Sequence, residues 1–231
     1  MELLVIYRLC NVSNISINKK RPSFYDKEKC LLNIIKTCSN FKKIKFLVLF
    51  DGIIPSDHFI NKYKNNIEVI NINANSGSKS YINAIDTAIK TNYKYVYLIE
   101  DDYLHRKNWD IILLEGLKTN CSYVTLYDHN DKYNLNMYPN LTSKIFYTKS
   151  IFWRTIPSTT DTFACKISTL KEDLQVHKKY SSNTNFSQDH LRFLHLGKLG
   201  RTIVSCLPGW STHLEVPYIS PLYDWSKEIY D

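Results

Sequence analysis

Paired cysteines, long apolar runs and a secretion signal are all missing from this sequence of 231 residues. None of its six cysteines forms a C-x-x-C pair or shows the spacing of zinc ligands, so we expect free thiols, mostly buried, in a reducing compartment. No stretch approaches the roughly 20 apolar residues that cross a bilayer. The N-terminal segment 1–8 lacks the basic start and apolar core of a signal peptide. These absences predict a cytoplasmic protein without a transmembrane segment, and peripheral contact with a membrane stays open.

The distribution of glycine and charge weakens two classes of function. The segment 8–22, after the first predicted strand, contains no glycine, whereas a metal-dependent nucleotidyltransferase or phosphohydrolase normally has a glycine-rich loop there. The formal net charge of +8 comes from lysines scattered along the chain, and nucleic-acid-binding proteins more often gather them in one patch. Both classes remain alternatives. The charge itself favours an anionic partner, nucleotide phosphates among them, and we expect no nucleic acid.

The order of the predicted elements indicates an α/β fold. Short apolar runs predict strands at 3–7, 44–50, 67–72 and 95–99. Apolar spacing and caps predict helices at 26–38, 56–63, 77–91 and 109–117. This alternation is typical of a mostly parallel sheet with right-handed crossovers, flanked by helices.

The second half of the sequence predicts a mixed region. We expect strands at 122–127 and 144–153, a strand or the start of a helix at 161–170, a helix at 186–196 and an irregular tail from Cys206. No linker rich in glycine, proline or serine divides the chain, so 1–231 is predicted to be one domain.

The most informative stretch is the apolar run 95–99, which ends in Glu100, Asp101 and Asp102. Three adjacent carboxylates repel one another in a dry site and become tolerable beside a divalent cation or hydrogen-bond donors. The C-terminal edge of an open α/β sheet is also where such folds bind ligands. We therefore expect a metal-assisted site for a phosphorylated ligand, with Asp102 best placed for the metal. A solvated acidic turn is the alternative.

Four further positions carry candidate side chains, each with a structural alternative. Asp51 ends the second predicted strand and either reads a nucleobase or caps a turn. The segment 75–80 offers backbone N–H groups and Lys79 to an oxyanion, or simply begins a helix. Asp189 is a general base or a helix-dipole partner. His213 is a ligand for Mn²⁺ or a packing residue.

Taken together, the pattern resembles a GT-A-fold (Rossmann-like) glycosyltransferase of the family 2 type. Glu100-Asp101-Asp102 is similar to the E-D-D form of the family's DXD motif. Asn75, Gly77 and Asn83 fall on the family's N-x-G element and its later Asn, although Ile82 stands where an Arg usually precedes that Asn.

The resemblance implies an activity and a set of roles. It implies transfer of a sugar from a nucleotide-diphosphate donor, UDP-linked by preference, to a glycan, lipid-linked or protein acceptor. Asp51 would read the base, Asp189 would be the base of an inverting reaction, and Asp102 and His213 would hold Mn²⁺ or Mg²⁺. The other donor-binding residues would be Tyr7, Arg8, Asn75, Gly77, Lys79, Asn83, Glu100 and Asp101. Residues 1–105 would bind the donor and residues 106–231 the acceptor.

Overall fold

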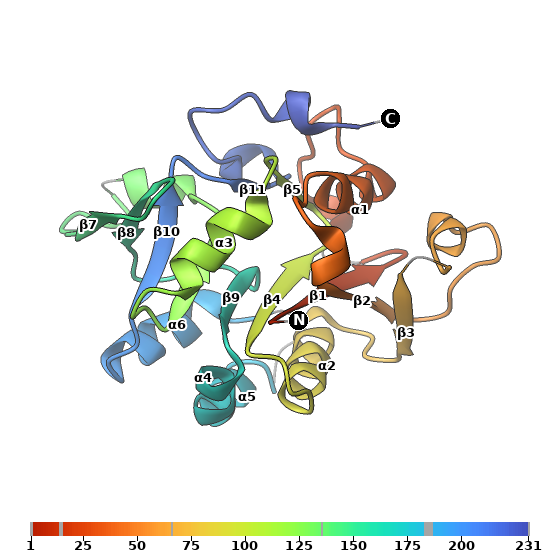
Figure 1. Ribbon diagram of the computed structural model, residues 1–231, viewed down its shortest axis with the longest axis horizontal. Helices are drawn as coiled ribbons and strands as arrows, with labels where there is room; N and C mark the ends of the chain where they lie inside the picture. Colours follow the sequence, from red (N-terminus) through yellow and green to blue (C-terminus); the bar gives the residue numbers. More distant parts are fainter. Residues whose placement is uncertain (1, 14–15, 66, 135, 183–186, 231) are drawn as a thin grey trace.

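A mixed sheet of nine strands forms the centre of the computed structural model shown in Figure 1. The structure describes residues 2–13, 16–65, 67–134, 136–182 and 187–230. The strand order is β3-β2-β1-β4-β9-β6-β10-β8-β7. The first four strands in this order are parallel: β3 (Glu68–Ile72), β2 (Lys45–Asp51), β1 (Leu3–Cys10) and β4 (Tyr95–Glu100).

The remaining strands extend the sheet with mixed directions. Strand β9 (Phe163–Lys166) runs antiparallel to both β4 and β6 (Tyr123–Thr125). Strand β10 (Ile203–Leu207) is parallel to β6, and the hairpin of β8 (Phe152–Thr155) and β7 (Ile145–Tyr147) forms the far edge. The predicted α/β fold, a mostly parallel sheet followed by a mixed region, is confirmed.

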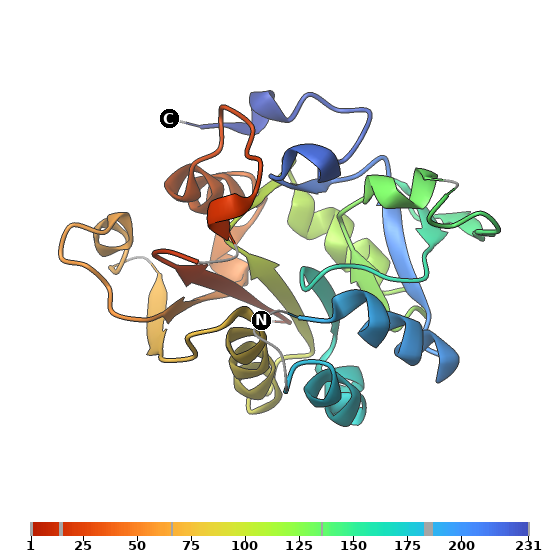
Figure 2. The same ribbon diagram turned by 180° about the vertical axis from the view of Figure 1, so that it is seen from behind.

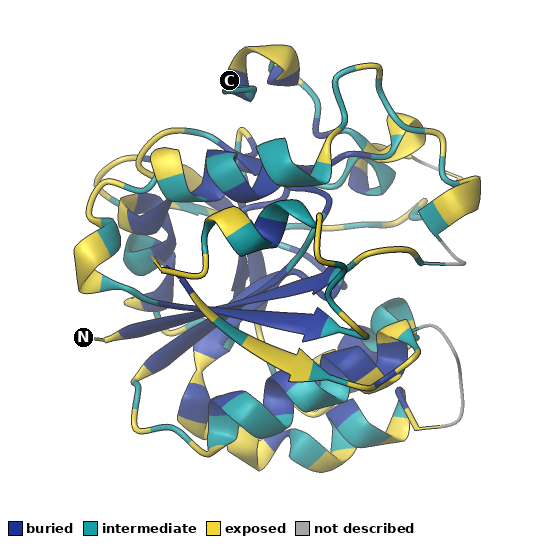
Figure 3. Cartoon of the chain, turned by 90° about the vertical axis from the view of Figure 1, so that its right-hand side faces the viewer, coloured by how far each residue is buried: buried dark blue, intermediate teal, exposed yellow. Residues whose placement is uncertain are grey.

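Helices cover both faces of the sheet because side chains alternate along each strand (Figure 3). Leu3 and Val5 of β1 face a core that includes α1 (Lys27–Lys36) and α3 (Trp109–Leu117). Leu4 and Ile6 face the opposite core, where the helices are α2 (Gly77–Ile89), α4 (Ile167–Glu172) and α6 (Asp189–Lys198). The short α5 (Leu174–Lys179) packs beside α4 and α6. Because both faces of the sheet are covered, the side chains of β1 and β4 that stay partly accessible are those at the carboxyl ends of the two strands.

A second, two-stranded sheet brings the end of the chain to the carboxylates. Strand β5 (Tyr103–His105) follows Asp102 directly and pairs antiparallel with β11 (Ser211–His213), so that His213 lies opposite Tyr103. The Leu214 N–H also donates to the Asp102 carbonyl at 2.8 Å. From behind, the C-terminal segment and the loop after β1 pass over the same edge of the large sheet (Figure 2), and the Val216 N–H donates to the Lys20 carbonyl at 2.8 Å.

Several predicted elements need correction. The segment 8–22 is not wholly loop, because β1 continues to Cys10 in register with β2 and β4. A single strand was expected at 144–153, but the chain turns back between β7 and β8. The tail from Cys206 is not irregular throughout, since β10 and β11 both lie in it. The expected helix at 56–63 is a 3-10 helix (Phe59–Lys62) whose cap is His58.

Other predictions are confirmed or refined. The segment 161–170 contains both alternatives, β9 and the start of α4. Helix α3 has the predicted bounds, and α1 and α2 begin behind the side-chain caps Asp26 and Ser76. All six cysteines are free thiols. Among the described residues, no helix is long and apolar enough to span a bilayer.

Candidate active site

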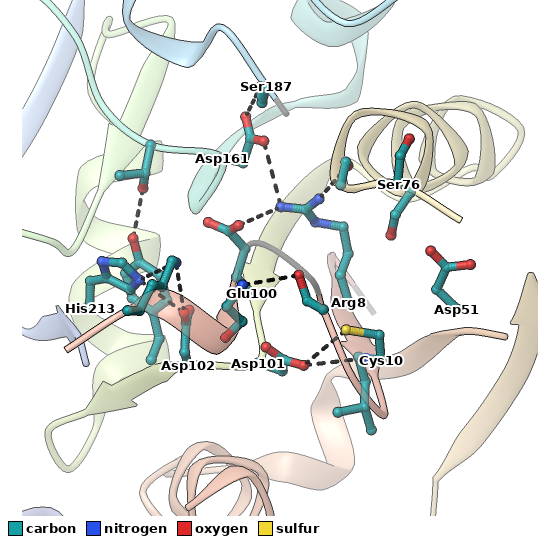
Figure 4. A pocket seen from close by; sticks show the side chains of 18 of the residues that line it. Arg8, Cys10, Asp51, Ser76, Glu100, Asp101, Asp102, Asp161, Ser187 and His213 are labelled. Carbon is teal, nitrogen blue, oxygen red and sulfur yellow. Dashed lines mark hydrogen bonds and ion pairs between the residues drawn. The ribbon is translucent and has the colours of Figure 1, made fainter. Parts of the chain in front are cut away.

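The carboxyl ends of the parallel strands open into a cavity of about 700 Å³, shown in Figure 4. Parallel strands end at the same sheet edge, so residues far apart in sequence meet there. Nine of the predicted site residues line this cavity: Arg8, Asp51, Asn75, Gly77, Glu100, Asp101, Asp102, Asp189 and His213. Residues predicted in both halves of the chain therefore lie around one cavity.

Arg8 connects β1, β4 and the start of α2. It lies opposite Glu100 in the parallel register, and its Nη2 lies 3.1 Å from Glu100 Oε1. Its Nη1 donates to the Gly77 carbonyl at 3.2 Å, and its Nη2 lies 3.7 Å from Asp161 Oδ2. Burial raises the pKa of Glu100, and the Arg8 guanidinium opposes that rise. Arg8 thus lines the cavity and ties the ends of β1 and β4 to the start of α2.

Asp161 is the centre of a cluster of charges that the sequence did not indicate. Besides Arg8, it pairs with the fully buried Arg192 of α6 and accepts a hydrogen bond from Ser187 Oγ at 3.0 Å. The Arg8 and Arg192 guanidinium groups both lie over the Tyr81 ring, at 5.5 and 4.3 Å from its centre. The cluster fixes the start of α6 against the sheet.

The three adjacent carboxylates have three separate sets of partners. Glu100 pairs with Arg8, as described above. Asp101 Oδ2 accepts from Lys27 Nζ at 2.7 Å and from the Cys10 N–H at 3.2 Å. Asp102 faces another side, toward His213. Because each carboxylate has its own cationic partner, the expected repulsion is relieved within the protein, and the stretch is not a solvated turn.

Asp102 and His213 are in direct contact. Asp102 Oδ2 lies 2.9 Å from His213 Nε2 and accepts from Arg21 Nη2 at 2.9 Å and Lys19 Nζ at 3.2 Å. Although burial opposes ionisation, the charge of His213 and its hydrogen bond, with Lys19 and Arg21, hold the pKa of Asp102 well below its usual range. The carboxylate is therefore ionised throughout the neutral range.

The pair has the chemistry of a partial metal site. Carboxylate oxygen and imidazole nitrogen together suit Mn²⁺, and Asp102 Oδ1 is buried without a hydrogen-bond partner. Within the described part of the chain, no three His, Cys, Asp or Glu side chains are grouped to hold a metal. Asp102 and His213 alone would leave most coordination positions of such an ion to ligands from outside these side chains.

At the other end of the cavity, Asp51 and the start of α2 form a polar wall (Figure 4). Asp51 Oδ1 accepts from the N–H groups of Ala74 and Asn75 at 2.7 and 3.1 Å, so it caps the loop after β3 and not the turn that directly follows its own strand. Asn75 has a positive φ of 58°, and Ser76 Oγ accepts from the Lys79 N–H at 3.2 Å. The capping alternative for segment 75–80 is therefore confirmed, although Asp51, Asn75 and Gly77 still face the cavity.

Asp189 lies at the first turn of α6 and lines two cavities. The second cavity has a volume of about 640 Å³ and includes His129, Tyr133 and Tyr218 in its lining. Burial and the neighbouring Asp161 carboxylate raise the pKa of Asp189 to about 7. A carboxylate with this pKa, placed between two cavities, can accept a proton near neutral pH.

Three predicted residues do not line the main cavity. Tyr7 points into the core beside Phe46, because alternation along β1 sends its neighbour Arg8 to the other face. Lys79 is exposed on α2, and Asn83 donates its side-chain amide to the Lys79 carbonyl, one turn earlier in the helix. The assignment of Tyr7 to the donor site therefore needs correction, and those of Lys79 and Asn83 stay predictions.

Three further charged residues at the site were not predicted from the sequence. Lys19 lines the cavity and Arg21 contacts Asp102, both from the loop after β1, and Asp161 lines the cavity from the segment between β8 and β9. The three consecutive basic residues of this loop, Lys19, Lys20 and Arg21, were the signal in the sequence that could have indicated a cation near Asp102.

Comparisons with known proteins establish the fold. No protein-family profile and no curated protein sequence matches the chain. The crystal structure of residues 1–349 of S. aureus TarS aligns with a TM-score of 0.54 and 15% sequence identity over 89% of this chain. The same region of S. aureus TarS in complex with UDP aligns with a TM-score of 0.52. This chain spans 58% and 57% of those two structures. The fold is therefore of the GT-A type found in TarS.

Proposed function

We propose that this protein is a glycosyltransferase that takes a sugar from a nucleoside-diphosphate donor, UDP-linked by preference, and transfers it to an acceptor hydroxyl. The observation that carries the proposal is the convergence of Asp51, Arg8, the E-D-D carboxylates, His213 and Asp189 on one cavity at the edge of the parallel sheet. The fold shared with S. aureus TarS, which was also solved with UDP, supports it.

The geometry suggests how the donor would lie. The nucleobase would bind near Asp51, whose Oδ1 already accepts two backbone N–H groups. The diphosphate would lie between Arg8 and the Asp102–His213 pair, where a Mn²⁺ or Mg²⁺ ion held by that pair would supply Lewis-acid stabilisation of the leaving group. The sugar would then extend toward Asp189, which lines the cavity at the start of α6.

Asp189 would act as the base of an inverting transfer. Its carboxylate would accept the proton of the acceptor hydroxyl while the acceptor oxygen forms a bond to the anomeric carbon of the donor. The bond between that carbon and the diphosphate oxygen would break, and its electron pair would leave with the nucleoside diphosphate. The second cavity shares Asp189 with the first, so it is the natural place for a glycan, lipid-linked or protein acceptor.

A donor screen tests the proposed class. Isothermal titration with UDP-, GDP- and dTDP-sugars in the presence of Mn²⁺ should reveal saturable binding, strongest for a UDP-sugar. Alanine in place of Lys118, which follows α3 and does not line the cavity, is a control that should leave the affinity unchanged. If none of the nucleotide sugars binds, the proposed function is excluded.

A further inference from the structure

Lys19 occupies the space beside both proposed metal ligands. Its Nζ lies 3.2 Å from Asp102 Oδ2 and 3.1 Å from His213 Nε2, with Glu215 Oε2 at 3.7 Å. A metal ion bound to the same oxygen and nitrogen would lie within a few ångströms of this ammonium group. Two cations that close repel strongly in a partly buried site, so a metal ion and Lys19 in this position compete.

We propose that Lys19 is a built-in cation of the site: it neutralises Asp102 in the donor-free protein and leaves when a divalent ion and the donor bind. This inference rests on the proposed donor site. Lys19 and Arg21 already give the Asp102 carboxylate two positive partners, which removes much of its attraction for a metal. A diphosphate brings negative charge and offers the displaced ammonium a new partner. Metal and nucleotide therefore bind cooperatively, each favouring the state without the Lys19–Asp102 contact.

The loop that carries Lys19 can release this side chain without unfolding. Arg21 anchors the loop independently, because it donates to the Leu214 carbonyl and Ser16 Oγ, both at 2.6 Å. The Lys20 carbonyl accepts from Val216. The Lys19 side chain keeps 23% of its surface exposed, whereas that of Asp102 keeps 6%. A rotation of one side chain toward the cavity is therefore sufficient.

The competing interpretation gives Lys19 a permanent role. In that case its ammonium would replace the metal altogether and hold the diphosphate directly. The two interpretations predict opposite effects of removing the charge: competition predicts tighter metal binding in the variant, and permanent replacement predicts loss of nucleotide binding without any gain for the metal.

The experiment measures Mn²⁺ binding to the full chain without nucleotide, by calorimetry and by the paramagnetic resonance signal of free Mn²⁺. Lys19→Met should bind Mn²⁺ about tenfold more tightly than the unchanged protein or more, because an adjacent like charge is removed. Lys20→Met, in which an exposed neighbouring lysine is changed, is the matched control and should show no gain. Lys19→Gln, which retains a polar group, serves as a second variant if Lys19→Met does not fold.

Addition of UDP completes the test. UDP should increase the Mn²⁺ affinity of the unchanged protein by more than it increases that of Lys19→Met, because part of the coupling is lost with the lysine. Equal or weaker Mn²⁺ binding by both Lys19 variants would overturn the inference, as would UDP binding that needs Lys19 and ignores Mn²⁺. Tighter Mn²⁺ binding by the variants, together with no binding of any nucleotide or nucleotide sugar, would uphold the competition and reject the proposed function alone.

Discussion

Arg8 and Glu100 lie opposite each other on two neighbouring parallel strands, and their side chains form an ion pair of 3.1 Å at the carboxyl edge of the sheet. The Arg8 guanidinium also reaches Gly77 at the start of α2 and Asp161 before β9. One side chain thus connects the start of α2, the end of β4 and the carboxylate that pairs with Arg192 of α6. The proposed donor site is built around this connection.

The first prediction separates chemistry from donor binding. Asp189→Ala should reduce sugar transfer by about 100-fold or more, the usual contribution of a general base, and should leave the affinity for the donor within about twofold. Steady-state transfer rates and calorimetry of donor binding measure the two effects. Glu172→Ala is the control, because Glu172 is exposed, pairs with Arg201 and does not line the cavity. A normal transfer rate in Asp189→Ala would exclude Asp189 as the base.

The second prediction concerns pH. Since Asp189 must be ionised to accept a proton and its pKa is raised to about 7, kcat/KM should fall about tenfold between pH 8 and pH 6. The folded-state pKa exceeds the unfolded value of about 3.9, so the folded protein binds more protons between these values. The stability linked to Asp189 is therefore lost as pH rises from about 4 to 7.

The same linkage supplies a readout that is independent of activity. Asp189→Asn cannot ionise, so its stability relative to the unchanged protein should increase from pH 4 to pH 8. Urea unfolding at both pH values measures this change. A pH–rate profile without an inflection near neutrality, or a variant whose relative stability does not move with pH, would contradict the assigned environment of Asp189.

The third prediction concerns the metal ligand. Asp102→Asn removes the negative charge next to His213, Lys19 and Arg21, so Mn²⁺-dependent donor turnover should fall by about 100-fold. Asp86→Asn is the control, because Asp86 lies on α2 and pairs with Lys178. Thermal unfolding should show that both variants fold. Full turnover by Asp102→Asn would rule out this residue as a ligand.

The fourth prediction tests the packing that supports the sheet, with two glycines as a matched pair. A Cβ atom at Gly116 of α3 would lie 2.6 Å from Trp153 and 2.7 Å from Val124, whereas one at Gly197 of α6 would meet nothing within 4 Å. Gly116→Ala should lower the free energy of unfolding by about 1–3 kcal/mol through overpacking. Gly197→Ala should raise it by about 0.5–1 kcal/mol, because alanine is the better helix former. Denaturant unfolding measures both, and equal effects would refute the packing assignment.

The first half of the fold was predictable because each of its elements has a local signal. Apolar runs mark β1, β2 and β4, and Asp26 and Ser76 cap the helices that they precede. The strands of the second half were harder to predict. Strand β10 lies between β6 and β8 in the sheet, yet proline and glycine follow it at once in the sequence. The strands that pair with β10 are dozens of residues away in the sequence, and no local pattern indicates this pairing.

The residues of the candidate site also form two groups, one that could be predicted from the sequence and one that could not. Asp51, Gly77 and Asp102 were predictable because Asp51 ends β2, Gly77 begins α2 and Asp102 closely follows β4, all at one sheet edge. Lys19 and Asp161 were not, since their roles arise from contacts with residues 83 positions away in one case and 31 in the other. Tyr7 was misassigned because the sequence does not show on which face of a doubly buried strand a side chain lies.

The central claim, that a nucleotide binds at the edge where β1, β2 and β4 end, is tested most directly by hydrogen–deuterium exchange of the full chain with and without UDP and Mn²⁺. If the nucleotide binds there, exchange should be slower in segments 74–80, 100–103 and 211–214 and unchanged in the hairpin 145–155. Protection confined to segment 129–134, in the second cavity, or no protection anywhere at saturating UDP, would contradict it.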